Sequence, residues 1–243
     1  MNKTIEELIK RRSIREFIDK EISNEDKQLI IEAAVNAPSA GNMQMYSIID
    51  ITEQDIKDKL AILCDNQPFI AKAKMILIFC ADYQKWLDTF NDLQLEPRHL
   101  DSGDFLLSSI DATIAAQNSV TAAFSLGIGS CYIGDILENC EQVVELLQLP
   151  NYVIPTCMVV FGYADLNNLK GSKPKRAANE YVVFENKYKR LSSDELKAMY
   201  LSKQIPKDYK EWMKAFIARK YNSDFLKEMS RSVNKYLEKY RKD

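Results

Sequence analysis

The sequence predicts an α+β fold in which a small sheet packs between helices. Three apolar runs of strand length lie at residues 46–51, 75–81 and 155–163, and a shorter one lies at 181–184. Six or more helical segments separate them without the regular strand–helix alternation of a parallel sheet. The chain has 243 residues, of which 46% are apolar, so it can form one large or two small domains with a substantial core.

The first part of the chain predicts two helices, a loop, a strand and a third helix. Thr4 is a suitable N-cap for the first helix, and Ser23 begins a second one with acidic residues in its first turn. Residues 37–42 combine proline, serine, glycine and asparagine, which is typical of a loop. The strand at 46–51 follows, and residues 53–63 return to a helical pattern.

The middle of the chain contains a long apolar helix. The run at 75–81 is typical of a strand buried on both faces, and residues 82–99 predict irregular structure. Residues 104–126 are apolar or small on nearly every side, which places this helix inside a core. Gly127 and Gly129 are expected to end it, and a further helix is expected over 133–147.

The last part predicts a strand, a basic loop and a helical arm. The strand at 155–163 is followed by a polar, basic loop over 167–180 and by the short strand at 181–184. From residue 193 the chain is lysine-rich and helical in pattern. We therefore expect a core domain over 1–190 and a basic helical C-terminal arm over 191–243.

Composition argues against several classes of protein. The apolar runs are much shorter than the roughly 20 residues of a membrane-spanning helix. The N-terminus lacks the apolar segment of a signal peptide, so we expect a cytoplasmic protein. The five cysteines form no C-x-x-C pair, which disfavours a structural zinc site or a disulfide framework. The single histidine, His99, cannot supply a histidine metal cluster.

The formal net charge of −2 is unevenly distributed along the chain. Residues 1–163 contain 13 basic and 24 acidic side chains, whereas residues 164–243 contain 20 basic and 11 acidic ones. The overall balance disfavours a general nucleic-acid-binding protein. A basic tail on an acidic body suggests self-association or an anionic small-molecule ligand.

Two basic segments are candidate anion sites. The segment RRSIR at 11–15 places three guanidinium groups and a hydroxyl within five residues, and arginine presents a planar fork of donors that suits phosphate or carboxylate. Lys173, Lys175 and Arg176 form a second cationic group in the predicted loop. On spacing alone, each segment is more typical of a solvated, charged surface than of an anion site.

Two glycine-containing segments are candidates for contact with a flat ligand. The loop PSAGNMQ at 38–44 offers small residues and hydrogen-bond donors, although an ordinary helix-to-strand loop has the same composition. The segment GIGSCYIG at 127–134 does not match the spacing of the dinucleotide-binding fingerprint, and a helix precedes it. Its glycines still permit close approach to a planar ring, whose face Tyr132 and Ile133 could cover.

These segments occur in the order and at the spacing of the FMN-dependent nitroreductase family, which the sequence resembles over residues 2–190. The resemblance is greatest to the oxygen-insensitive nitroreductases and flavin reductases that prefer NADPH. Each matching stretch is weak alone, but the ordered set is specific. The stretches are RRSIREF at 11–17, PSAGNMQ at 38–44, NQPFIAKA at 66–73, the helix and glycine segment at 110–136, KPK at 173–175 and VVFENKY at 182–188.

The resemblance implies a three-layer α+β sandwich, with a mainly antiparallel sheet between helices, in an intertwined homodimer. Two FMN sites would lie between the chains, and the strand at 181–184 would extend the partner's sheet. The helix at 104–126 would lie in the dimer interface. Residues 1–190 would form the FMN-binding core, and the arm over 191–243 would pack on the core or on the partner subunit.

The resemblance also assigns residues that bind the cofactor. The segment 11–15 would hold the FMN phosphate, the ribityl chain and one ring edge, while Gln67 would hydrogen-bond the flavin edge. No catalytic side chain and no metal is expected, because the flavin carries the chemistry. The residues expected to bind FMN are Arg11, Arg12, Ser13, Arg15, Ser39 from the partner chain, Gln67, Tyr132, Ile133, Gly134, Lys173 and Lys175.

Three positions depart from the family pattern. Arg11 stands where this branch often has histidine, and Lys175 stands where it often has arginine, so a bidentate contact becomes a point charge at Lys175. Asp135 follows Gly134 where relatives often have another glycine. Its carboxylate could narrow the pocket or repel an anionic substrate.

The implied function is an NAD(P)H oxidoreductase that uses FMN in a ping-pong scheme. Hydride from the nicotinamide would reach flavin N5 and then pass to a nitroaromatic, a quinone or a free flavin. NADPH and NADH are both possible co-substrates, and no nucleic-acid or membrane partner is expected. A non-catalytic FMN-binding or flavin-storage protein on the same scaffold is the alternative. A flavin-free protein that binds an acidic partner through its basic tail is a third possibility.

Overall fold

The computed structural model describes the chain except for residues 169–172, 202–207 and 242–243. It contains two compact units, residues 1–169 with 228–243, and residues 170–227. These limits differ from the expected division at residue 190, so the assignment of an FMN-binding core and a separate arm stays a prediction.

The first unit is built on a four-stranded sheet of order β1-β2-β4-β3, in which every neighbouring pair is antiparallel. Its strands are β1 (Tyr46–Asp50), β2 (Met75–Asp82), β3 (Gly129–Ile133) and β4 (Val153–Gly162). The central strand β2 is buried along its whole length, as its apolar run predicted. The predicted mainly antiparallel sheet is therefore confirmed, and β1 and β3 are its two edges.

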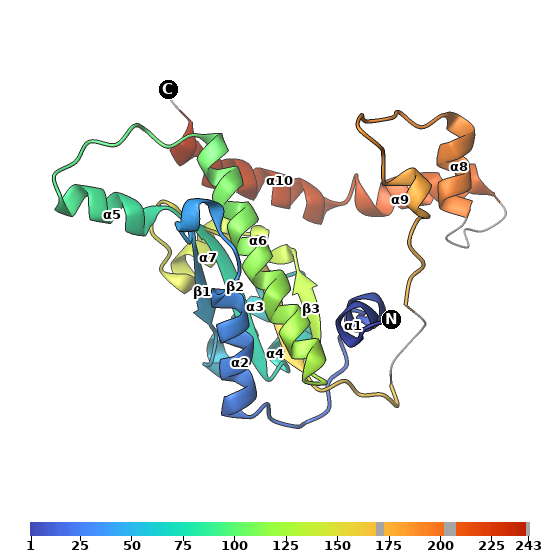
Figure 1. The fold of residues 1–243 in the computed structure, drawn as a ribbon, viewed down its shortest axis with the longest axis horizontal. Helices are drawn as coiled ribbons and strands as arrows, with labels where there is room; N and C mark the ends of the chain where they lie inside the picture. The colour runs from blue at the N-terminus through green and yellow to red at the C-terminus, as the bar shows by residue number, and fades with distance from the viewer. Residues whose placement is uncertain (169–172, 202–207, 242–243) are drawn as a thin grey trace. The chain divides into compact units, whose positions relative to one another are not determined.

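Helices cover both faces of the sheet, which gives the three layers that the resemblance implied (Figure 1). Along β2, Leu77 and Phe79 face one helical layer, whereas Ile76 and Ile78 face the other. The first layer contains α2 (Asn24–Val35) and α6 (Ser102–Ser125), and the second contains α3 (Gln54–Leu63), α4 (Pro68–Ala71) and α7 (Cys140–Leu147).

Helix α6 packs closely against the sheet. Small side chains on its buried face, among them Ala112, Ala116 and Ala123, let the helix axis approach the strands. The helix therefore belongs to the core, as its composition predicted. It also exposes an apolar surface in the single chain, where Leu106 is 61% exposed and Ile110 is 47% exposed. Among the described helices, none is both long and apolar enough to cross a bilayer.

The start of the chain and the segment before α6 differ in detail from the prediction. Helix α1 (Lys3–Lys10) is capped by Asn2, whose side chain accepts a backbone N–H, and not by Thr4. Ser23 caps α2 as expected. A helix, α5 (Gln84–Asp92), lies in the stretch that was expected to be irregular. Its sequence lacks helix-breaking residues, and Pro97 comes only after its end.

Two strand predictions are wrong, because one strand was not predicted and one predicted strand is not formed. Strand β3 occupies residues that were expected to end one helix and begin the next, and α7 begins at Cys140 instead of residue 133. The strand expected at 181–184 is not formed in the single chain, where a 3-10 helix, η3 (Asn179–Tyr181), ends at the first of these residues and the others are irregular. A strand needs a neighbour for its backbone hydrogen bonds. The resemblance placed that neighbour in a second subunit.

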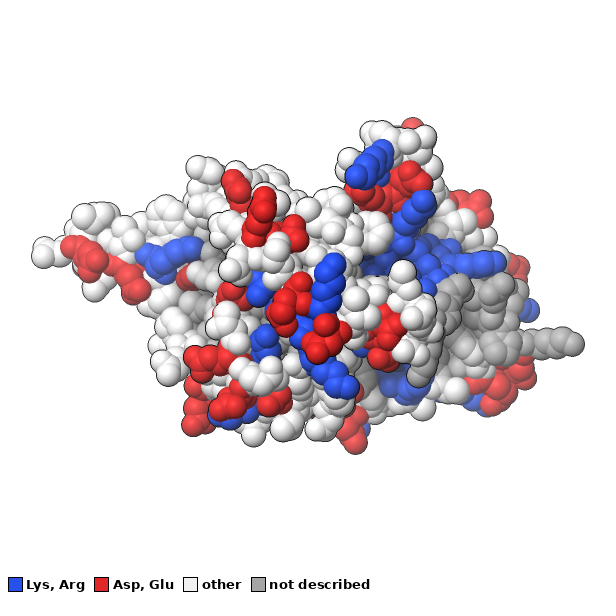
Figure 2. Space-filling view, turned by 90° about the horizontal axis from the view of Figure 1, so that it is seen from below, with Lys and Arg blue, Asp and Glu red and all other residues white. Residues whose placement is uncertain are grey.

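The second unit is helical and basic. It contains α8 (Ser193–Leu201), α9 (Tyr209–Lys220) and the first residues of α10 (Asp224–Leu237). Trp212 and Phe216 stack within α9, with ring centroids 5.1 Å apart. Residues 170–227 contain 15 basic and 7 acidic side chains. On the face of the molecule shown in Figure 2, basic and acidic side chains of the described residues are interspersed over much of the surface.

From Glu228 onward, α10 belongs to the first unit, where a charged network fixes it to α7. The Arg231 guanidinium donates to both Glu141 oxygens at 2.8 Å and to the Glu228 carboxylate at 2.8 and 2.9 Å. The Ser232 hydroxyl accepts from the Cys140 N–H at 3.0 Å. Hydrogen bonds from the arginine hold the pKa values of Glu141 and Glu228 well below the usual carboxyl range.

We expect Arg231→Ala to loosen α10 from α7. The free energy of unfolding should fall only slightly, because the guanidinium is half-exposed and solvent screens its ion pairs. A carboxyl with a lowered folded pKa stabilises the fold above its unfolded pKa of about 4.3, and this stabilisation is lost as the pH falls through the folded value. Urea unfolding should therefore separate the variant from the wild type at neutral pH, and the two should converge in strong acid.

The matched control for this variant is Lys214→Ala, which breaks an exposed ion pair with Glu211 inside α9. It should leave the α7–α10 contact intact. Equal unfolding midpoints for Arg231→Ala and the wild type at neutral pH would contradict a stabilising role for the network.

Candidate functional site

The segment 11–15 runs alongside the edge strand β3 and extends the sheet. Ser13 forms a parallel bridge with Ser130, and the Ile14 N–H donates to the Ser130 carbonyl at 2.9 Å. Phe17 forms an antiparallel bridge with Ala164 farther along the chain. The arginine-rich motif is therefore extended backbone held on a sheet edge, and not a free turn after α1.

Two glycines make this close approach possible. Gly129 of β3 and Gly162 of β4 are paired in register. A Cβ on Gly129 would lie 2.7 Å from Ile14 Cγ1, and a Cβ on Gly162 would lie 2.7 Å from Phe17 Cδ1. Gly129 was expected to end a helix. The structure shows that it makes room for the segment that carries the arginines.

Arg11 provides a buried cationic group at this edge. Its backbone ends α1, where its N–H donates to the Glu7 carbonyl at 2.9 Å. Its side-chain Nη1 is buried and has no hydrogen-bond partner among the described residues. Buried donors are nearly always satisfied, because an unpaired one costs the full desolvation penalty. The N–H groups of Arg11 Nη1, which have no partner among the described residues, therefore indicate a binding position for an anionic acceptor.

The other residues of the motif also lie around β3. Burial raises the pKa of the Cys131 thiol, while the charges of Arg15 and Arg11 and a hydrogen bond with Ser13 oppose this effect. These three residues are therefore close enough to β3 to act on one side chain. Arg12 lies between them in the chain and makes contacts of its own within the protein.

The end of β3 presents an open position next to a half-buried tyrosine and a buried isoleucine. The Tyr132 hydroxyl donates to Gln117 Oε1 of α6 at 3.3 Å, and burial raises the pKa of this tyrosine. The Ile133 side chain is 2% exposed and packs in the core, so it cannot cover a ligand ring in this arrangement. A Cβ on Gly134 would meet no atom within 4 Å. Gly134 thus borders free space where the resemblance places the flavin ring.

Gln67 joins this group through the residue that departs from the family pattern. Its Nε2 donates to the Cys64 carbonyl at 2.8 Å and to Asp135 Oδ2 at 2.9 Å. Asp135 begins the 3-10 helix η2 (Asp135–Leu137), which directly follows Gly134. Burial and the neighbouring Asp135 carboxylate raise the pKa of Glu138, at the end of this helix, to about 7. Asp135 was expected to affect the site, whereas Glu138 was not predicted. The signal for Glu138 in the sequence is a second acid three residues after Asp135 in an apolar stretch.

Ser39 lies elsewhere in the first unit. It belongs to the loop before β1, at the sheet edge opposite β3, and its hydroxyl accepts from the Gln44 N–H at 3.1 Å. The next residue, Ala40, donates its N–H to Asp111 of α6 at 3.0 Å. Lys173 and Lys175 belong to the second unit, and their contribution to the site stays a prediction. Residues 169–172 of the expected basic loop lie outside the described residues.

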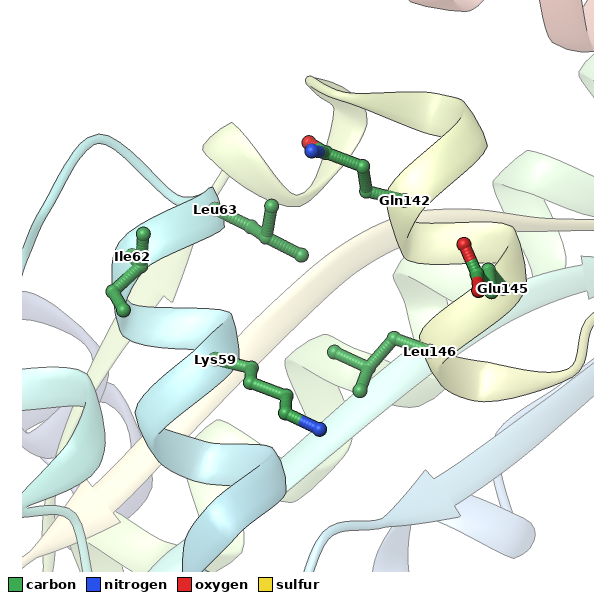
Figure 3. A pocket seen from close by; sticks show the side chains of 6 residues that line it. All are labelled: Lys59, Ile62, Leu63, Gln142, Glu145 and Leu146. Carbon is green, nitrogen blue, oxygen red and sulfur yellow. The ribbon is translucent and has the colours of Figure 1, made fainter.

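A separate pocket of about 440 Å³ lies between α3 and α7 (Figure 3). Three apolar side chains line it together with a lysine from α3 and a glutamine and a glutamate from α7. Its lining includes none of the residues that the resemblance assigned to the cofactor. The lining residues are Lys59, Ile62, Leu63, Gln142, Glu145 and Leu146.

Comparison with known proteins agrees with this geometry. The chain is 32% identical over 246 residues to an FMN reductase (NADPH) from Bacillus subtilis (strain 168), with 100% of this chain and 98% of the relative covered. It is 38% identical over 201 residues to an oxygen-insensitive NADPH nitroreductase from Salmonella typhimurium, with 82% and 80% covered.

A solved structure has the same fold. The NADPH:FMN oxidoreductase from Vibrio harveyi complexed with NAD+ matches with a TM-score of 0.82 at 28% identity, covering 97% of this chain and 98% of that one. The model of the nitroreductase family matches residues 8–163, more than half of the chain. The resemblance seen in the sequence is confirmed, and the chain belongs to the nitroreductase family.

Proposed function

We propose that this protein is an NAD(P)H-dependent FMN oxidoreductase that reduces small acceptors such as nitroaromatics, quinones or free flavin. The observation that carries this proposal is the buried Arg11 Nη1, which has no partner among the described residues, in a side chain whose charge acts on Cys131 and Tyr132 of β3. The relatives of this chain include an FMN reductase (NADPH) and an oxygen-insensitive NADPH nitroreductase. Their names support the same chemistry.

The residues around β3 fit FMN. Arg11 and Arg15 are the kind of donors that suit a phosphate, because the guanidinium fork matches phosphate oxygens. The free space beside Gly134 suits a flat ring, and the Gln67 carboxamide suits its polar edge. Lys173 and Lys175 remain proposed ligands on the resemblance alone.

Bound FMN would supply the redox chemistry, taking electrons from a reduced nicotinamide and passing them to the acceptor. The chain's own residues bind and orient the ring. The fixed cationic groups of Arg11 and Arg15 stabilise negative charge nearby, because they are already oriented when that charge develops. No protein nucleophile is required, which is consistent with a chain that has a single histidine.

We also propose that the protein is a cytoplasmic homodimer in which each chain contributes to both sites. Ser39 lies at the sheet edge opposite β3, so it can reach an FMN only across an interface. The exposed apolar side chains Leu106 and Ile110 on α6 provide a surface for a second copy. Sedimentation of the wild type should give a dimer, and Ile110→Glu should shift it towards the monomer and release FMN.

The proposed activity is tested by anaerobic mixing. Purified protein is expected to be yellow, or to bind FMN after reconstitution, and NADPH or NADH should rapidly bleach the flavin absorbance. Addition of a quinone or a nitroaromatic should restore it. Bound FMN that no nicotinamide bleaches would favour the flavin-storage alternative, and a protein that binds no FMN would exclude both.

A further inference from the structure

The orientation of the Gln67 side chain is determined by two acceptors. Its Nε2 lies 2.8 Å from the Cys64 carbonyl and 2.9 Å from Asp135 Oδ2. A backbone carbonyl can only accept, so the nitrogen and not the oxygen of the carboxamide must face it. Both N–H groups of Gln67 are then used within the protein. A ligand beside Gln67 therefore meets the carbonyl Oε1, which is an acceptor.

Glu138 directly follows η2, and one oxygen of its carboxyl group has no hydrogen-bond donor among the described residues. The Glu138 N–H donates to the Asp135 carbonyl at 3.0 Å across one turn of η2, and, besides burial, the Asp135 carboxylate is close enough to raise the pKa of the Glu138 carboxyl. The Glu138 residue is 5% exposed, and its Oε1 is buried without a partner among the described residues. Two carboxyl groups can share a hydrogen bond only if one of them carries a proton.

The charged neighbours of Glu138 increase its affinity for a proton. They are Asp135 in η2, Asp65 after α3 and Glu228 in α10, and all three are acids. Glu228 is itself neutralised by Arg231. The nearby Cys64 thiol is buried, and burial is the main reason that its pKa lies above the usual range, with the two acids of η2 adding to the effect. A second negative charge on Glu138 would therefore be placed in a buried, acidic environment.

We propose that Asp135 and Glu138 hold one proton between them and act as a positioning pair that fixes Gln67 as a hydrogen-bond acceptor at the cofactor site. The inference rests on the proposed function, because Gln67 contacts a flavin only if FMN binds beside β3. Loss of the shared proton leaves two carboxylates in contact, and their repulsion draws Asp135 away from Gln67. FMN binding should then weaken as the pH rises through neutrality.

Loss of the shared proton should also lower the stability of the fold as the pH rises, just as it weakens FMN binding. A carboxyl whose folded pKa lies above its unfolded value of about 4.3 destabilises the fold progressively as the pH rises between those two values. The flavin-free wild type should therefore have a lower melting temperature at pH 8.5 than at pH 6. Glu138→Gln should make this difference smaller, because its amide donates to Asp135 as the protonated acid does and does not titrate, while the buried thiols with raised pKa values lower stability at pH 8.5 in both proteins.

Two measurements on the full-length protein test the pair. In flavin-free protein, infrared spectroscopy should detect the carbonyl band of a protonated carboxylic acid that titrates near neutral pH and is absent in Glu138→Gln. In a fluorescence titration, the ratio of the FMN dissociation constant of the wild type to that of Glu138→Gln should rise about 3–10-fold from pH 6 to pH 8.5, as expected for one linked proton. The FMN phosphate titrates alike in both proteins, so its effect cancels in this ratio. Glu145→Gln, an exposed acid on α7, is the matched control and should behave as the wild type.

Asp135→Asn is the second variant, should Glu138→Gln fail to fold. Its amide can donate to the Glu138 carboxylate while its oxygen accepts from Gln67, so it should also remove the part of the pH dependence that comes from the shared proton. A wild type with no titrating acid band, and with FMN binding that changes with pH only as much as that of Glu138→Gln, would overturn the proposal. A protein that binds no FMN at any pH would overturn the proposed function instead, while the infrared band would still decide whether the proton is shared.

Discussion

Arg11→Met is expected to weaken FMN binding by about 10–100-fold, the equivalent of one charge-assisted hydrogen bond. Methionine keeps most of the side-chain volume but removes the guanidinium. In the flavin-free protein, Arg11 Nη1 is buried without a partner among the described residues, so its removal relieves a desolvation penalty. The melting temperature of the flavin-free variant should therefore be unchanged or higher.

The contrast between the two measurements distinguishes a ligand-binding arginine from a structural one. Arg98 provides the control, because its guanidinium already binds both oxygens of Asp104 at 2.7 Å at the start of α6. Arg98→Met should lower the melting temperature slightly and leave the FMN dissociation constant unchanged. If Arg11→Met loses stability but retains FMN, then Arg11 is a structural residue and the proposed phosphate site is wrong.

Sequence patterns predicted the layers of the fold well, because burial determines both the pattern and the structure. The apolar run at 75–81 became the central strand, and the alanine-rich residues of 104–126 became the helix packed on the sheet. The errors are at positions where local sequence is not decisive. The segment 129–133 is short and rich in small residues, and it is a strand because β4 and the segment 11–15 lie on either side of it.

The sequence predicted which residues belong to the candidate site, but it did not predict which of them contact one another. The motif 11–15 was expected near glycines, yet the pairing of Gly129 with Gly162 depends on the register of two strands far apart in the sequence. The burial of Ile133 was equally unpredictable, because it depends on which face of β3 meets the core. Glu138 was missed because only tertiary packing places it beside three other acids.

Gly129→Ala should destabilise the flavin-free protein, whereas Gly134→Ala should leave its stability almost unchanged. The new Cβ at Gly129 would lie 2.7 Å from Ile14 Cγ1 and 3.2 Å from the Gly162 carbonyl oxygen, so Ile14 must move. Overpacking of this kind costs about 1–3 kcal/mol. The backbone that shifts also carries Ser13 and Arg15, so FMN affinity should fall together with the melting temperature.

At Gly134 the backbone has φ −78° and ψ −22°, which alanine adopts without strain, and the added Cβ meets no atom within 4 Å. The free energy of unfolding of the flavin-free Gly134→Ala protein should therefore lie within about 0.5 kcal/mol of the wild-type value, or slightly above it. Its affinity for FMN should nevertheless fall, because the methyl group enters the space that the ring would occupy. Thermal unfolding of the flavin-free variants and fluorescence titration with FMN measure the two effects separately. If Gly134→Ala binds FMN as tightly as the wild type, the ring does not lie against the end of β3, and the orientation proposed for Gln67 loses its ligand.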